Sequence, residues 1–312
     1  MGGQSTNYGS SRGYDWSDSK SVTRRSARSY AQDDRRRYTG SSEGLGAPVG
    51  KEIKTNSKLA AILVVDVTGS MHTWPQLIFE KIPTLYTECN AVLQGLELDE
   101  LKKKGKNIED LLEMAVIAVG DAQGDSSPLQ VLDFSKGADL VKGVNKIYPE
   151  GNGGGNAKES YDLAAYFILN HCKTPKVSKE AKPLVIIAGD EGFYEKIKVR
   201  EVKDLIGDNL TKSLDTSDVI KKLTKKYDTY ILRPEEHYDA GTYARIHNQW
   251  QKALGAQRAL KMDNPQRLVD CIIGICAYAS DNFKIGEDML KRRQTPEQVT
   301  QVLETLHPLL KK

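Results

Sequence analysis

The sequence predicts an α/β fold of three layers: a doubly wound, mainly parallel sheet, Rossmann-like in arrangement, with helices on both faces. Two observations carry this prediction. Continuous apolar runs of five to seven residues, typical of strands buried on both faces, recur along the chain. Segments with helical spacing separate them, and strands that alternate with helices are typical of a parallel sheet. In such folds the ligand site lies at the carboxyl ends of the strands.

Strands and helices are expected in a regular order along the chain. The predicted strands are short and rich in apolar residues: Leu59–Val65, Met114–Val119, Leu129–Phe134, Leu184–Ala188 and, as the last, Thr229–Leu232. The predicted helices show wider apolar spacing: Pro75–Leu96, Asp139–Ile147, Lys158–Cys172, Val219–Lys226, Thr242–Leu260, Gln266–Ala279 and Pro296–Leu306. Pro83 interrupts the first helix because proline lacks a backbone donor. Glu97–Glu113 is a charged connection.

The composition predicts that part of the chain does not pack. Apolar residues make up 39% of the 312 residues, below the ~45–50% typical of globular chains. The first 56 residues are rich in Ser, Gly, Arg and Tyr and show no apolar periodicity. Such a segment buries too little surface to offset its conformational entropy. We therefore expect a disordered basic tail over residues 1–56, a folded domain over 57–282 and a helical C-terminal tail over 283–312.

The positive charge of the chain belongs to the tail. Residues 1–56 carry ten Lys and Arg against six Asp and Glu. The whole chain has a net charge of +3, which excludes a simple affinity of the protein as a whole for nucleic acid. Six arginines form a stretch suited to an anionic membrane or nucleic acid, or simply a solvated linker: Arg24, Arg25, Arg28, Arg35, Arg36 and Arg37. Residues 1–6 also fit the pattern for N-myristoylation of Gly2. An acyl chain together with this stretch would hold the protein peripherally on a membrane.

The cysteines and the apolar runs predict a cytoplasmic protein. Four cysteines are scattered without CxxC spacing, so we expect no disulfide framework or zinc site and a reducing compartment: Cys89, Cys172, Cys271 and Cys276. Three of them lie in apolar surroundings, where a buried free thiol is expected. No uncharged apolar run reaches the ~18 residues of a membrane span. The N-terminus lacks the apolar core of a secretory signal.

Polar residues follow the first predicted strand on a tight turn. Asp66 offers a carboxylate, and Thr68 and Ser70 offer hydroxyls. Hard cations such as Mg²⁺ prefer oxygen ligands of this kind. The same residues also suit a turn in which a hydroxyl caps the next helix. Taken alone, this loop does not distinguish a cation site from a capped turn.

Two more polar loops follow other strands. Residues 149–160 form a Gly-rich loop in which Asn156 has an oxygen that suits a cation or a helix cap, and no Gly-Lys-[ST] follows as in a Walker loop. Asp190 follows the strand Leu184–Ala188 after a single glycine, where an acidic residue belongs to a site or caps a turn. Because the carboxyl ends of parallel strands share one edge of the sheet, three such loops favour a site more than any one of them.

Together the three loops resemble von Willebrand factor A domains. The run from Asp66 to Met71 (DVTGSM) resembles the D-x-[ST]-x-S motif that opens the metal-ion-dependent adhesion site of this family, in its DxTGSM variant. Residues 153–160 (GGGNAKES) resemble the GGGDxPES loop of an intracellular branch that includes A domains attached to alpha-kinases. Val119-Gly120-Asp121 resembles a turn of that branch, and Asp190 matches the acid of the third loop. The resemblance covers about Lys58 to Ser280.

The resemblance implies a Mg²⁺ or Mn²⁺ ion held by Ser70 and Thr68, with Asp66 and Asp190 close by, some through water. Asn156 departs from the Asp or Thr usual at its position, which lowers the charge of the site. In this family the open position of the ion often accepts a carboxylate from a protein partner. The resemblance therefore implies a metal-dependent binding module that scaffolds an intracellular assembly, and no enzyme.

Two enzymatic functions are alternatives to the binding module. Residues 66–70 also resemble the DKTGT of phosphorylated transport ATPases, so that Asp66 would be the nucleophile of a haloacid-dehalogenase-like phosphatase and Asp190 its metal-binding acid. Most soluble phosphatases of this type need a second Asp where this chain has Thr68, and the Gly-rich loop has no role in them. Residues 124–126 (GDS) would be an esterase motif, but it does not follow the first strand and no later Asp-x-x-His accompanies it.

Overall fold

The computed structural model describes residues 44–71, 73–97, 108–150, 156–177, 182–234 and 239–311. Its strands are β1 Ile53–Lys54, β2 Leu59–Asp66, β3 Leu112–Val119, β4 Leu129–Ser135, β5 Lys158–Glu159, β6 Cys172–Lys173, β7 Leu184–Ala188, β8 Gly192–Phe193, β9 Lys196–Ile197, β10 Leu214–Asp215, β11 Asp228–Pro234 and β12 Ala259–Met262. Its helices are α2 Thr73–Glu80, α3 Ile82–Leu93, α5 Gly137–Val144, α6 Tyr161–His171, α7 Val199–Leu205, α8 Thr216–Lys226, α9 Ala240–Leu254, the 3₁₀ turn η1 Pro265–Arg267, α10 Leu268–Ala279, α11 Phe283–Arg293 and α12 Pro296–Leu310.

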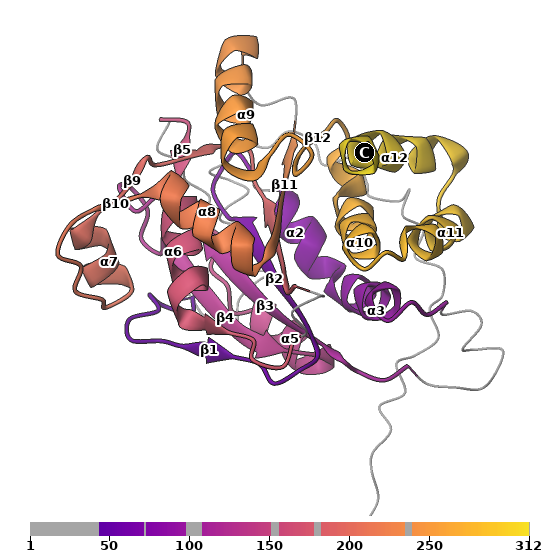
Figure 1. Ribbon diagram of the computed structural model, residues 1–312, viewed down its shortest axis with the longest axis horizontal. Coiled ribbons are helices and arrows are strands. Elements are labelled where there is room, and N and C mark those ends of the chain that lie inside the picture. The colour runs from indigo at the N-terminus through magenta and orange to yellow at the C-terminus, as the bar shows by residue number, and fades with distance from the viewer. Residues whose placement is uncertain are drawn as a thin grey trace, which may run out of the picture.

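A six-stranded sheet in the order β12-β11-β7-β2-β3-β4 forms the centre of the protein (Figure 1). All neighbouring strands are parallel except β3 and β4. This confirms the predicted α/β class with a mainly parallel sheet. The chain passes from β2 to β3 on one side and later reaches β7 on the other, so the crossovers diverge between β2 and β7.

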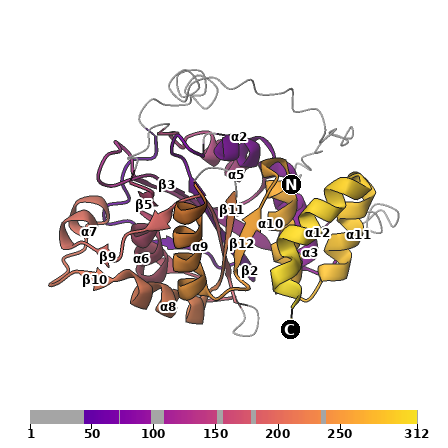
Figure 2. The ribbon, with the colours of Figure 1, turned by 90° about the horizontal axis from the view of Figure 1, so that it is seen from above.

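Helices cover both faces of this sheet because β2 is apolar on both sides. Leu63 and Val65 belong to the apolar core beneath α2, α3 and α10, whereas Ile62 and Val64 belong to the core beneath α6, α8 and α9. Figure 2 shows α3 and α10 on one side of the sheet and α6 and α8 on the other. Successive side chains of a strand point to opposite faces, so a continuous apolar run is what this position requires.

The central strands lie where the sequence predicts them. The described strands β2, β3, β4, β7 and β11 contain the five predicted apolar runs. The predicted break at Pro83 is confirmed, because α2 ends at Glu80 and α3 begins at Ile82 with the proline in its first turn. A proline is tolerated there since the first backbone donors of a helix have no partner within the helix.

Two predicted helices were wrong at one end. The helix predicted to reach Leu260 ends at Leu254, where Gly255 adopts a φ of 94°, and the chain then forms β12 beside β11. Thr229–Leu232 is therefore not the last strand. The helix predicted from Lys158 begins at Tyr161, because Lys158 and Glu159 pair with β8 instead.

The prediction of a disordered tail through residue 56 was wrong for residues 44–56. Ile53 is buried, and β1 runs parallel to β6 with Ile53 opposite Cys172. Thr55 is also buried and donates a hydrogen bond from Oγ1 to Glu113 Oε2. Gly2 and the six arginines of the tail lie outside the described residues. Among the described helices, none is both long and apolar enough to cross a bilayer.

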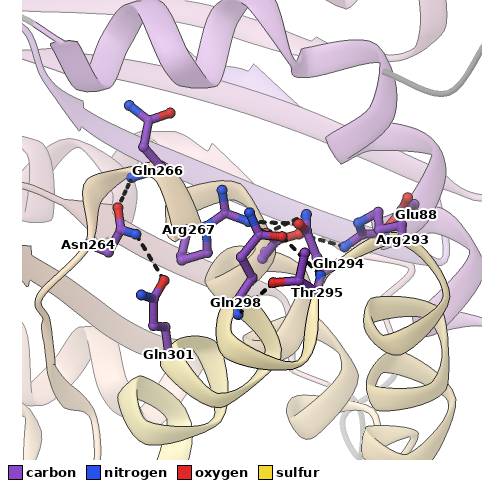
Figure 3. A network of polar contacts seen from close by, with 10 residues as sticks. Glu88, Asn264, Gln266, Arg267, Arg293, Gln294, Thr295, Gln298 and Gln301 are labelled. Carbon is purple, nitrogen blue, oxygen red and sulfur yellow. Dashed lines mark hydrogen bonds and ion pairs between the residues drawn. The ribbon is translucent and has the colours of Figure 1, made fainter. Parts of the chain in front are cut away.

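The C-terminal segment predicted as a helical tail is helical and packs on α10. Leu290 of α11 and Leu306 of α12 belong to the same apolar core as α3 and α10. A buried polar network links these helices (Figure 3). Arg293 pairs with Glu88 of α3 and with Asp270 of α10, and Asp270 also accepts a hydrogen bond from Gln294. The C-terminal helices therefore share one core with the sheet.

Arg293→Ala should destabilise the protein far more than Arg292→Ala. Removal of Arg293 takes away the cation that contacts the buried carboxylates of Glu88 and Asp270, and it leaves Asp270 with Arg267 at 3.4 Å. This loss costs about 3–5 kcal/mol. Arg292, at the next position of the same helix, is 46% exposed and pairs with Glu97, so its loss costs about 1 kcal/mol or less. The free energies of unfolding in urea measure both effects. Equal losses would mean that the network contributes nothing specific.

Candidate functional site

Three loops meet at the carboxyl ends of β2 and β7. Val65 lies opposite Ala188 in the β2–β7 ladder, so the loops that follow these strands are neighbours. The β5–β8 ladder, in which Glu159 lies opposite Phe193, brings the end of the Gly-rich loop to the same place. Residues 151–155 of that loop lie outside the described residues. The site is thus at the switch point of the sheet, where ligands bind in folds of this kind.

Four of the predicted ligands form one chain of polar contacts. Asp66 Oδ1 accepts hydrogen bonds from Thr68 N at 2.9 Å and from Thr68 Oγ1 at 2.5 Å. The Thr68 hydroxyl lies 3.4 Å from Ser70 Oγ, which donates to Asp190 Oδ1 at 3.2 Å. Asp66, Thr68 and Asp190 are fully buried, and Ser70 is half-buried. The structure therefore brings oxygen atoms from two loops, 120 residues apart, into contact.

Tyr161 completes the surroundings of Asp66, and the sequence does not predict it. Its hydroxyl donates to Asp66 Oδ2 at 2.6 Å, and its ring packs edge-on against Trp250 with centroids 5.4 Å apart. Gly189 makes room for it, since a Cβ at this position would lie 1.8 Å from the tyrosine oxygen. No local pattern marks this tyrosine, because its role depends on a glycine from another strand end.

The site buries carboxyl groups whose charged forms its donors do not fully stabilise. Burial, and next the charge of Asp190, raise the pKa of Asp66 to about 8. Glu159 is fully buried, and neither carboxylate oxygen has a hydrogen-bond partner among the described residues. Burial, followed by the charge of Asp66, raises its pKa to about 11. A positive ligand would relieve this repulsion.

One buried cation lies next to the third loop. Arg233 of β11 is fully buried and donates from Nε and Nη2 to the backbone carbonyl of Asp190, at 3.2 and 2.6 Å. These bonds fix the loop backbone and leave the carboxylate of Asp190 directed at Ser70. Arg233 belongs to none of the sequence motifs, although a charged residue at the end of an apolar strand is a signal that could have found it.

Asn156 lies in a neighbouring group of polar residues. Its Nδ2 donates to Asp121 Oδ2 at 3.3 Å and to the Tyr194 hydroxyl at 2.8 Å, and its Oδ1 accepts from Lys158 N. Tyr194 in turn donates to Asp121 Oδ1 at 2.9 Å. Among the described contacts, none joins Asn156 to the four other predicted ligands.

The donor set fits a small hard cation in its chemistry. Two carboxylates and two hydroxyls, from Asp66, Asp190, Thr68 and Ser70, are oxygen ligands of the type that Mg²⁺ and Mn²⁺ accept. Within the described ranges, no group of three or more His, Cys, Asp or Glu side chains is arranged to hold a metal ion. The candidate set therefore depends on its hydroxyls and on further ligands such as water.

Comparison with known proteins gives a likeness in fold and none in sequence. No known family matches the chain, and no curated protein matches it. Similar solved structures include the open form of the pilus adhesin SpaC from Lactobacillus rhamnosus GG, with a TM-score of 0.45 and 13% identity over 77% of this chain and 31% of that one. Proximal thread matrix protein 1 from the mussel byssus has a TM-score of 0.44 and 10% identity over 73% of this chain and 49% of that one.

A third structure is a von Willebrand factor type A protein from Catenulispora acidiphila, with a TM-score of 0.40 and 16% identity over 76% of this chain and 48% of that one. This chain thus spans less than half the length of each of these three structures. The likeness extends to the α/β architecture and no further.

Tyr161→Phe should destabilise the protein more than Tyr166→Phe. The first change leaves the buried Asp66 without one of its donors, which costs about 1–3 kcal/mol. Tyr166 lies on the same helix and donates to Asp208, which is 34% exposed and also contacts His171, so its loss costs about 1 kcal/mol or less. Urea unfolding with a chelator present measures both losses in the free energy of unfolding. A larger loss for Tyr166→Phe would contradict the role of Tyr161 as a donor to Asp66.

Without divalent ions, the stability of the protein should fall as the pH rises. The pKa of Asp66 is about 8 in the folded state against 3.8 as its ordinary value, so the folded state holds an extra proton between these values. The free energy of unfolding then decreases with pH across this range. Asp66→Asn removes this contribution, so the free energy of unfolding of this variant should decrease less steeply with pH. Urea unfolding at several pH values in a chelating buffer measures the difference.

The control for this experiment is Asp139→Asn, since Asp139 is 83% exposed on α5. It should keep the pH dependence of the wild type. If the free energy of unfolding of Asp66→Asn shows the same pH dependence as that of the wild type, the carboxyl of Asp66 is already charged in the folded protein at low pH.

Proposed function

We propose that this protein is a binding module of the von Willebrand factor A type that engages a partner carboxylate through a Mg²⁺ or Mn²⁺ ion. The observation that carries the proposal is the contact between the hydroxyl of Ser70 and the carboxylate of Asp190, which joins the loops after β2 and β7 at the switch point. The excess of buried carboxylate at this point supports a positive ligand. The resemblance of residues 66–71 to DxTGSM supports the same assignment.

Ser70 and Thr68 would hold the ion with their hydroxyls, and Asp66 and Asp190 would balance its charge. The bound ion would supply a positive centre with an open position for a carboxylate oxygen. Tyr161 would keep Asp66 oriented, because its hydroxyl fixes Oδ2 while Thr68 fixes Oδ1. Asn156 would contribute through its neighbours, since its amide bonds to Asp121 and Tyr194.

A binding role is favoured over an enzymatic one by the surroundings of Asp66. Both of its oxygens accept hydrogen bonds, from Thr68 and Tyr161, whereas a phosphatase nucleophile needs a free oxygen to attack phosphorus. The residue two positions on is Thr68, which lacks the carboxyl of a general acid. The module would then act as a scaffold in an assembly.

The proposed location is the cytoplasm, and the four buried free cysteines support a reducing compartment. The partner would be a protein that presents an acidic side chain or a carboxyl terminus. The six tail arginines would add contacts with an anionic membrane or nucleic acid, and an acylated Gly2 would place the protein peripherally on a membrane.

Mg²⁺ or Mn²⁺ should raise the melting temperature of the wild type and leave that of Asp66→Asn unchanged. A ligand that binds only the folded state stabilises it, by about 2.7 kcal/mol at a concentration of 100 times Kd. Asp66→Asn loses a charge that the ion needs, yet without metal it should be at least as stable as the wild type because it removes a buried carboxylate. Thermal unfolding during metal titration measures both expectations.

The exposed-site variant Asp139→Asn should keep the full metal response. A flat melting temperature with every divalent ion would exclude the metal site while leaving the fold intact. Metal-dependent hydrolysis of a phosphate ester that Asp66→Asn abolishes would favour the phosphatase alternative instead.

A further inference from the structure

A cavity lies on a part of the protein away from the candidate cation ligands. A cavity of about 280 Å³ lies between α9, β12, η1 and α12, at the edge of the sheet away from β3 and β4. None of the four candidate cation ligands lines it. Its volume is near the lower limit for small-molecule sites, which suits a ligand of metabolite size.

Two buried nitrogen-bearing side chains line this cavity. His247 is 8% exposed and Arg267 is 2% exposed. His247 Nδ1 and Arg267 Nε are buried without a hydrogen-bond partner among the described residues. Burial, followed by the charges of Arg233 and Lys261, lowers the pKa of His247 to about 4, so its ring is neutral at neutral pH. Buried polar atoms without partners cost free energy, which a ligand with matching atoms recovers.

The walls around these residues are held in place by side-chain bonds. Arg267 Nη1 donates to Gln294 Oε1 at 2.8 Å and pairs with Asp270 Oδ2 at 3.4 Å, and these two contacts fix the guanidinium (Figure 3). Asn264 donates to Gln301 Oε1 at 2.9 Å and accepts from Gln266 N, which ties η1 to α12. The positions of Arg267 and of the α12 wall are therefore set before any ligand arrives.

Charges of both signs line the cavity, and one of them, Arg267, also pairs with Asp270 outside the lining. Arg267 and Lys261 are cationic, and Asp263 and Glu304 are anionic. Lys261, Asp263 and Glu304 are exposed, whereas Arg267 is buried. A simple anion such as phosphate would face two carboxylates, and a simple cation would face two positive groups. A ligand with both charges a short distance apart meets neither problem.

We propose that this cavity binds a free α-amino acid in its zwitterionic form. The ligand carboxylate accepts a hydrogen bond from Arg267 Nε in the presence of the Lys261 charge, and the ligand ammonium pairs with Asp263 and Glu304. The neutral ring of His247 offers one more hydrogen bond. The small apolar residues of the lining leave room for the ligand side chain: Ala256, Ala259 and Pro308. This site is independent of the proposed cation-dependent function.

The test is a thermal-shift screen of the full-length protein against each proteinogenic amino acid, added as the free compound at millimolar concentration with a chelator present. Calorimetry then gives Kd for any amino acid that raises the melting temperature. The amide of that amino acid, which lacks the carboxylate, and its des-amino acid, which lacks the ammonium, serve as probes of the two charges. Inorganic phosphate tests for a simple anion site.

At least one amino acid should raise the melting temperature, while its amide and its des-amino acid should not. Glu304→Gln should weaken binding by about tenfold or more, because one charge-assisted contact is lost. Glu297→Gln, which changes another exposed residue of the same helix outside the cavity, should leave Kd unchanged. Both changes replace exposed residues, so the fold should tolerate them.

The proposal is overturned if no amino acid raises the melting temperature. It is also overturned if phosphate or the des-amino acid binds as tightly as the amino acid, since the cavity would then be an anion site. Unchanged affinity in Glu304→Gln would place the binding elsewhere. Because the chelator removes divalent ions, these outcomes are separate from success or failure of the cation site.

Discussion

The parallel pairing of β2 with β7 is the constraint on which the rest of the structure depends. Val65 lies opposite Ala188 in this ladder, so the residues that follow the two strands emerge side by side at one edge of the sheet. The crossovers diverge at this point, which is where α/β folds bind ligands. The short β5–β8 ladder adds the end of the Gly-rich loop to the same edge. Backbone pairing alone thus gathers three polar loops from distant parts of the chain.

This gathering is unfavourable for the carboxylates that it buries. Asp66, Glu159 and Asp190 are fully buried, and a buried charge costs several kcal/mol unless it is paired. The donors Thr68 and Tyr161 offset part of this for Asp66, and Glu159 has no such donor among the described residues. The two apolar cores and the polar network around α10 must therefore offset the unfavourable free energy of burying these carboxyl groups. A rigid frame around a destabilising polar centre is the arrangement that a preorganised ligand site requires.

The sequence predicts the central strands and the residues beside them, because both are marked locally. A strand buried on both faces must be apolar throughout, and Asp66 ends such a strand while Asp190 follows another after a single glycine. The sequence does not predict β12, since Ala-Leu-Lys-Met consists of residues that favour a helix and becomes a strand only beside β11. It does not predict Tyr161 or Glu159 as site residues either. Their positions depend on the β5–β8 ladder and on the missing side chain at Gly189, which are relations between distant segments.

Asn156 shows how the structure changes the meaning of a single substitution. Judged by sequence resemblance, a neutral amide in place of Asp removes charge from the cation site. In the structure its Nδ2 donates to Asp121 Oδ2 at 3.3 Å and to Tyr194. An Asp at this position has no N–H to donate and would place a second negative charge beside Asp121, in a region where Asp125 and Glu159 already have raised pKa values. The amide therefore joins the Gly-rich loop to the turn after β3 in a way that a carboxylate would oppose, while Asp66 and Asp190 still supply carboxyl oxygens at the switch point.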